Sequence, residues 1–343
     1  MTAIPHEAMG RQLVAAARWR PAEWVFWLFA AATVLLFPDR YLILTEVAWL
    51  GLFALSLDLI LGYAGIVSLG HAAFFGIGAY SAGLLAKHGL INEPVLALVV
   101  AGFAAAVVGF LTSFLVMRGS DLTRLMVTLA IALVLRELAN RFSDITGGFD
   151  GLQGITVAPV LGLFEFDLFG KVGYIYCLSV LFLLFVLARR IVHSPFGLSL
   201  RAIRNNPLRA AAIGIPVNRR LIWIYTVAAF YAGVAGALFT QSSAIASLDV
   251  FAFDRSADLM LVLVIGGTGY LYGGLIGAAI FKLLQQEVSS LTPQYWQFWI
   301  GLVLVVIVLL GRQRIESAVT FVPRRIARLF GKEIAALPGG EAP

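Results

Sequence analysis

The sequence predicts an all-α polytopic membrane protein with about ten transmembrane helices, some of them broken by glycines. Of its 343 residues, 60% are hydrophobic and only 13% are charged, whereas soluble domains carry about 25% charged residues. The apolar residues also lie in long runs such as Val95 to Met117, and a spanning helix needs roughly 20 mostly apolar residues. These runs are too uniformly apolar for the alternating strands of a transmembrane β-barrel.

The apolar runs place the candidate spans in order along the chain. A basic segment, 1–23, precedes a run that ends Phe37-Pro38-Asp39-Arg40 and not in a small-residue cleavage site, so we interpret this run as a retained first span. One transmembrane domain, 24–311, is followed by a tail, 312–343. The predicted spans are 24–38, 41–61, 66–86, 94–117, 121–142, 172–191, 222–243, 257–268, 272–288 and 295–311.

Lys and Arg residues near the span ends predict the orientation, because they concentrate on the cytoplasmic side of membrane proteins. With a cytoplasmic amino terminus, the inner segments hold most of these residues. The outer segments hold only Arg40, Lys87, Lys171 and Arg255. This asymmetry predicts that both termini are cytoplasmic and that the number of spans is even. It also accounts for the net charge of +6 without nucleic-acid binding.

Glycines interrupt the apolar stretch from Gly62 to Tyr80, which reads GYAGIVSLGHAAFFGIGAY. Non-helical backbone at membrane depth is tolerated only beside protein or a water-filled cavity, so we interpret the stretch as a broken helix in the middle of the bundle. Gly76 and Gly78 would let neighbouring helices approach closely. Tight packing without any path is the alternative. His71 would either contact substrate or hydrogen-bond the backbone that the break frees.

Six glycines interrupt a second hydrophobic stretch, Gly266 to Gly277. It lacks the Lys-Ser/Thr pair of a phosphate-binding P-loop, so we exclude nucleotide binding there. Paired glycine-broken segments indicate the central path of a transporter. The predicted path residues are Gly62, Gly65, Ser68, Gly70, His71, Gly266, Gly267 and Gly269.

The predicted cytoplasmic loop 192–221 contains no acidic residue. Ser194 with Pro195 suits a helix start, Pro207 allows a second helix over about 208–213, and Gly214 would end it. A permease could insert such a helix pair into the groove of a motor subunit, and a passive connecting loop is the alternative. The predicted anchors are Phe196, Leu198, Ile203 and Ile213, with Arg201 and Arg204 at the rim.

Four ionisable residues lie inside predicted spans: Asp58, Arg136, Glu137 and Lys282. Such residues usually face the interior of the bundle, because they are costly in lipid. In the outer loop 143–171, turn-forming residues at 146–154 predict a compact structure. The single cysteine, Cys177, excludes an intramolecular disulfide and a multi-cysteine metal site.

Four of these stretches together resemble the LivM-type permease subunits of branched-chain amino-acid ABC importers, which are closely related to urea-importer permeases. They are 62–80, 146–154, 201–217 and 266–277. The resemblance implies a bacterial inner-membrane heterodimer with a LivH-like permease, two cytoplasmic ATPase subunits that use ATP, and a periplasmic binding protein. It implies no cofactor on this chain. The expected coupling residues are Phe196, Leu198, Arg201, Arg204, Asn205, Ala211 and Gly214.

Two other classes of function compete with an importer subunit. An ion-coupled secondary transporter would need intramembrane carboxylates or cation sites at broken helices, and Asp58 and Glu137 give it little support. A membrane enzyme would need a catalytic group of residues, and the sequence shows neither paired histidines nor a carboxylate pair. We therefore predict an ATP-driven importer of branched-chain or related amino acids, with a urea or other small-solute importer as the alternative.

Overall fold

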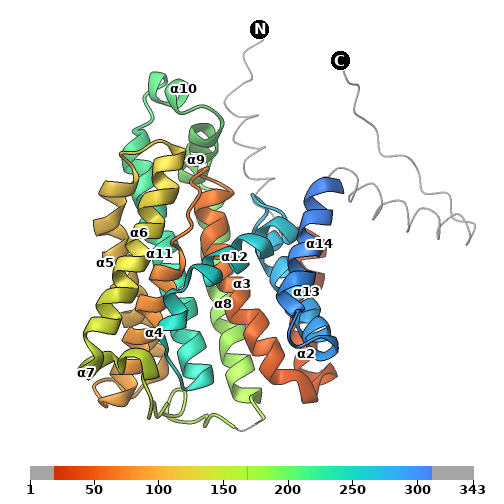
Figure 1. The fold of residues 1–343 in the computed structure, drawn as a ribbon. Helices are drawn as coiled ribbons and strands as arrows, with labels where there is room; N and C mark the ends of the chain where they lie inside the picture. The colour runs from red at the N-terminus through yellow and green to blue at the C-terminus, as the bar shows by residue number, and fades with distance from the viewer. Residues whose placement is uncertain (1–18, 168, 311–343) are drawn as a thin grey trace, which may run out of the picture. The chain divides into compact units, whose positions relative to one another are not determined.

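The computed structural model describes residues 19–167 and 169–310, so the predicted amino-terminal segment and tail lie largely outside the described residues. Within the described residues, the chain forms helices joined by loops and two isolated β-bridges (Figure 1). The helices are α2 (Pro21–Leu36), η1 (Pro38–Arg40), α3 (Tyr41–Leu61), α4 (Ala72–Lys87), α5 (Pro94–Val116), α6 (Asp121–Arg141), α7 (Ser143–Thr146), η2 (Gly148–Asp150), α8 (Lys171–Val192), α9 (Pro195–Asn205), α10 (Pro207–Ala212), α11 (Val217–Ser243), η3 (Leu248–Phe251), α12 (Phe253–Gly266), α13 (Leu271–Leu291) and α14 (Trp296–Leu310).

Every predicted span coincides with a helix, but ten complete crossings are not confirmed. Among the described residues, four helices are long and apolar enough to cross a membrane: α3 with η1, α5, α8 and α11. A fifth crossing results if α12 and α13, which meet at a bend of 111°, count as one span. Helix α6 carries too many charged residues to count as a membrane span, whereas α2 and α4 are too short to count as one.

Helix α11 lies at the centre of the bundle and packs against α3, α4 and α5. Small residues permit this approach. A Cβ atom added at Gly78 of α4 would overlap the carbonyl of Gly233, and one added at Gly236 would overlap the carbonyl of Phe75. The close packing that we predicted from Gly78 is therefore confirmed, and it explains why α4 and α11 are rich in glycine and alanine.

The chain divides into two compact units, Met1–Lys282 and Leu283–Pro343. The described part of the second unit comprises the end of α13 and α14. All the site residues discussed below lie in the first unit.

The two ends of the first unit carry different structures. Helices α9 and α10 lie at one end of the bundle, and α7 lies at the other (Figure 1). At the α7 end, the Thr146 hydroxyl donates to the Ala139 carbonyl at 2.6 Å, and the Leu152 N–H donates to the Ala246 carbonyl at 2.7 Å. Gly147, Gly148, Gly151 and Gly154 all have positive φ. The compact loop predicted at 146–154 is thus confirmed.

Candidate translocation and coupling site

The first glycine-broken segment is a buried, non-helical stretch between α3 and α4. Helix α4 begins at Ala72, so the predicted helical start at residue 66 is wrong. Side chains from helices distant in the sequence accept hydrogen bonds from backbone N–H groups at this break. The Leu69 N–H donates to Thr128 Oγ1 at 3.2 Å, and the Ala72 N–H donates to Ser256 Oγ at 3.0 Å. Because these acceptors stabilise an open backbone inside the bundle, an apolar stretch remains non-helical there.

His71 is completely buried next to this break. Its Nε2 hydrogen-bonds Ser56 Oγ at 2.8 Å, and its ring stacks on Phe53 with the centroids 5.7 Å apart. The partner of His71 is therefore a side chain and not the freed backbone. His71 Nδ1 and Ser68 Oγ have no hydrogen-bond partner among the described residues. In this conformation both residues belong to the core, so their predicted contact with a solute would require the segment to open.

The second glycine-broken segment connects α12 to α13. Gly267 and Gly269 have φ of 91° and 80°, a backbone conformation that favours glycine. Gly269 also joins this segment to the first one, because its N–H donates to Asp58 Oδ1 at 2.7 Å. Asp58 lies one turn before the end of α3, and its carbonyl accepts from the Gly62 N–H at 2.7 Å. The two segments singled out by their glycines therefore lie side by side, linked through one carboxylate.

The helix pair predicted in the loop 192–221 is confirmed as α9 and α10. The Ser194 side chain caps α9 by accepting from the Gly197 N–H at 3.4 Å. Asn206 caps α10 by accepting from the Arg209 N–H at 2.9 Å. Gly214, with φ of 86°, follows the end of α10. These caps satisfy N–H groups at the start of both short helices, and α9 also buries Leu200 and Ile203.

Two arginines of α9 point toward the glycine-broken segment. Arg204 Nη1 donates to the Gly62 carbonyl, and the Arg204 side chain lies against Gly65. The Arg201 guanidinium lies 5.3 Å from the centre of the Tyr63 ring. We predicted both arginines at the rim of a docking surface, and their described contacts are made with the membrane bundle. Helix α9 and the broken segment are thus in direct contact.

The remaining predicted coupling residues fall into two groups. Ile203 is 2% exposed, so its prediction as an anchor for a partner is wrong, and Phe196 is half-buried beneath the Arg220 guanidinium. Leu198 and Ile213 are exposed, and so is Leu208, which our sequence reasoning missed. Because α10 has only six residues, it shows no periodicity that would have singled out Leu208. We call the following exposed residues the exposed tip: Leu198, Asn205, Leu208, Ala211, Ile213 and Gly214.

The ionisable residues predicted inside spans do not all face the interior of the bundle. Asp58 is completely buried, and Lys282 Nζ pairs with the Glu46 carboxylate at 2.8 Å. Glu137, on the lightly packed helix α6, is exposed, so the prediction of an interior position is wrong for it. Within the described residues, no group of His, Cys, Asp or Glu side chains is arranged to hold a metal ion.

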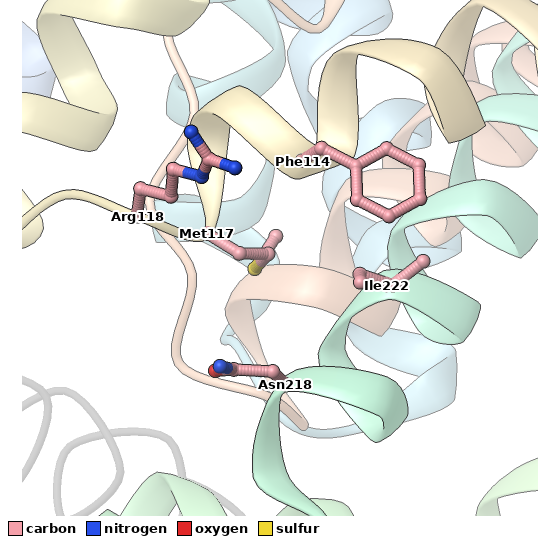
Figure 2. Close-up of a pocket in the computed structure, with 5 residues that line it drawn as sticks. All are labelled: Phe114, Met117, Arg118, Asn218 and Ile222. Carbon is pink, nitrogen blue, oxygen red and sulfur yellow. The ribbon is translucent and has the colours of Figure 1, made fainter.

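A pocket of about 320 Å³ lies between the end of α5 and the start of α11 (Figure 2). Phe114, Met117 and Arg118 come from α5 and the residue pair that follows it, and Asn218 and Ile222 come from α11. None of these residues was predicted from the sequence, and none belongs to either glycine-broken segment. The pocket therefore involves neither glycine-broken segment, although Asn218 belongs to the loop 192–221.

Comparisons with known proteins identify the family of this chain. The family model of the permease component of branched-chain amino acid transport systems matches residues 41–308. The high-affinity branched-chain amino acid permease protein LivM of Escherichia coli K12 is 27% identical over 280 residues, which are 75% of this chain and 65% of that protein. The ribose import permease protein RbsC of Bacillus subtilis is 29% identical over 291 residues, which are 79% of this chain and 84% of that protein.

A probable branched-chain amino acid permease protein LivH of Methanocaldococcus jannaschii is 29% identical over 249 residues, covering 69% of this chain and 76% of that protein. The chain spans just under two thirds of the length of the bacterial LivM proteins that it matches. No solved structure matches it. Since the family model covers most of the chain and all of the glycine-broken segments, the protein belongs to the family of permease components of branched-chain amino acid transport systems, as a LivM-type member.

Proposed function

We propose that this protein is one permease subunit of an ATP-driven importer, in which it forms half of the translocation path. The observation that carries the proposal is the contact of Arg204 with Gly62, because it connects a helix pair outside the bundle core to a glycine-broken segment inside it. The exposed tip offers Leu208 (83% exposed) and Ile213 (71% exposed) to a partner. An apolar tip on a short helix suits the groove of a separate ATPase subunit.

The proposed partners are a LivH-like permease subunit, two cytoplasmic ATPase subunits and a periplasmic binding protein. The proposed solutes are branched-chain amino acids, supported by the names of the LivM and LivH relatives. Related ribose and fructose permeases keep other small solutes as the alternative, and the sequence resemblance adds urea. The ATP chemistry belongs to the ATPase subunits, and the role of this chain is conformational.

Reconstitution tests this function directly. The complete complex, assembled from this chain and its proposed ATPase, permease and binding-protein partners, is placed in liposomes. We expect ATP-dependent uptake of radiolabelled leucine that exceeds uptake of urea and ribose. Uptake driven by an ion gradient without ATP would identify a secondary transporter and contradict the proposal. ATP-dependent uptake of urea or ribose alone would keep the mechanism and change the solute.

The proposed orientation places α9 and α10 in the cytoplasm and α7 in the periplasm. Leu208 and Phe149 are matched reporters, since they are 83% and 87% exposed at opposite ends. With the buried Cys177 replaced by alanine, an impermeant maleimide added to intact cells should label Phe149→Cys and leave Leu208→Cys unmodified. Inside-out vesicles should give the reverse result. Labelling of Leu208→Cys in intact cells would overturn the orientation.

A further inference from the structure

Asp58 is completely buried, yet only one of its carboxylate oxygens is hydrogen-bonded. Oδ1 accepts from the Gly269 N–H at 2.7 Å. Oδ2 has no hydrogen-bond partner among the described residues. Leaving a buried charged group partly unsatisfied is costly, and such groups in native proteins call for a physical explanation. Oδ2 is therefore a buried acceptor without a described donor in this conformation.

Arg204 is the cation best placed to supply that donor. Its guanidinium has five N–H donors in a planar fork, and the described hydrogen bond uses Nη1 on the Gly62 carbonyl. The same Nη1 lies 3.1 Å from the position that a Cβ atom would take on Gly269. The positive charge of Arg204 also acts on the Asp58 carboxylate. Both charged groups thus border the same two glycines, one from each broken segment.

We propose that Arg204 alternates between the Gly62 carbonyl and the Asp58 carboxylate, and that Asp58 thereby transmits movement of α9 to both glycine-broken segments. This inference rests on the proposed function, because it assigns residues to the coupling step. When Arg204 hydrogen-bonds the Asp58 carboxylate, it competes with the Gly269 N–H for Oδ1. The loop between α12 and α13 is then released from the end of α3.

The hydrogen-bond inventory explains why two arrangements can be close in free energy. In the described arrangement the Gly62 carbonyl and the Gly269 N–H are satisfied, while Oδ2 is not. In the second arrangement a bidentate arginine satisfies both carboxylate oxygens through charge-assisted hydrogen bonds, while the Gly62 carbonyl loses its donor and the Gly269 N–H loses its acceptor. Neither arrangement satisfies every group. A motor subunit that displaces α9 therefore has to supply only the difference in free energy between two discrete states.

The alternative is that Asp58 is a static link between α3 and Gly269. Asp58→Asn separates these possibilities, because the amide oxygen still accepts from Gly269 while the negative charge is lost. In the reconstituted complex, we expect Asp58→Asn and Arg204→Gln each to lower leucine uptake at least tenfold. Basal ATPase activity and subunit association should remain. Arg190→Gln, an exposed arginine at the end of α8, is the matched control and should leave uptake unchanged.

The double variant completes the test. If the two residues act on each other, Asp58→Asn combined with Arg204→Gln should be no worse than either single change, and Arg204→Lys should retain more uptake than Arg204→Gln. Wild-type uptake by both single variants, or losses that multiply in the double variant, would overturn the switch. If Asp58→Asn lowers the yield of folded protein, Arg204→Gln and Arg204→Lys decide alone, since Arg204 is exposed. ATP-dependent uptake by the wild-type complex verifies the proposed function independently.

Discussion

Replacing Gly65 with valine is expected to lower uptake by about tenfold or more while the membrane bundle remains folded. Gly65 has φ of 75°, and an added Cβ atom would lie 3.1 Å from Arg204 Cγ. A β-branched residue in this region costs about 1–3 kcal/mol in backbone strain, and the new side chain would also push against Arg204. Both effects displace the turn on which α9 rests. We expect uptake to fall by about tenfold or more, since 1.4 kcal/mol corresponds to a factor of ten.

A matched control separates backbone strain from the contact with α9. Gly162 has a similar φ of 68°, but nothing lies within 4 Å of an added Cβ atom. Gly162→Val should therefore impose comparable strain and leave uptake near the wild-type level. Transport measured in vesicles, with the thermal stability of the purified complex beside it, checks both variants. Normal uptake by Gly65→Val would show that this turn plays no part in coupling.

Gly70 is expected to behave differently, although it lies in the same segment. A Cβ atom there would overlap the carbonyl of Thr128 in α6. Gly70→Leu should therefore prevent correct packing, and the measured result should be a loss of folded protein in the membrane. Two glycines of one motif therefore have different roles. Gly70 is required for packing of the bundle, whereas a substitution at Gly65 tests coupling in a bundle that still folds.

Hydrophobicity was sufficient to locate the helices, because each apolar run was long and bounded by turn-forming or charged residues. It failed at the start of α4, where the apolar residues Ile66 and Val67 are not helical. There, Thr128 and Ser256 supply the hydrogen bonds that release the backbone from helical geometry. Such acceptors come from residues 59 and 184 positions away in the sequence, so no local pattern reveals them.

The candidate site was predicted in its parts and not in its connections. Glycine content identified both broken segments, and the Ser-Pro and Gly signals identified the helix pair. The sequence does not show toward which side a short helix turns its arginines, because Arg201 and Arg204 are exposed residues of α9 that nevertheless contact Tyr63 and Gly62 of the bundle. Arg204 was consequently placed on the partner side. The role of Asp58 as the link to Gly269 depends on a contact 211 residues apart in sequence, which no spacing rule predicts.

Charge placed on the exposed tip should uncouple the ATPase subunits from transport. Leu208, Ala211 and Ile213 are all exposed, and Leu208 and Ile213 supply the large apolar side chains that we expect a partner to bury. Apolar anchors at the centre of an interface commonly contribute about 2 kcal/mol or more each. Leu208→Asp or Ile213→Asp would remove that contribution and also bury an unpaired carboxylate. The double variant should therefore lose association with the ATPase subunits.

Two comparisons make this result specific to docking. Leu163→Asp introduces the same charge at a leucine that is 78% exposed in the loop on the α7 side, and it should leave ATPase association unchanged. Ala211→Asp, a smaller change on the same tip, should retain association and lose substrate-stimulated ATPase activity. The membrane bundle should remain folded in every case, because none of these side chains is buried. Retained association, stimulation and uptake in the Leu208/Ile213 double variant would reduce α9 and α10 to a passive connection, and the proposed coupling would lose its mechanical basis.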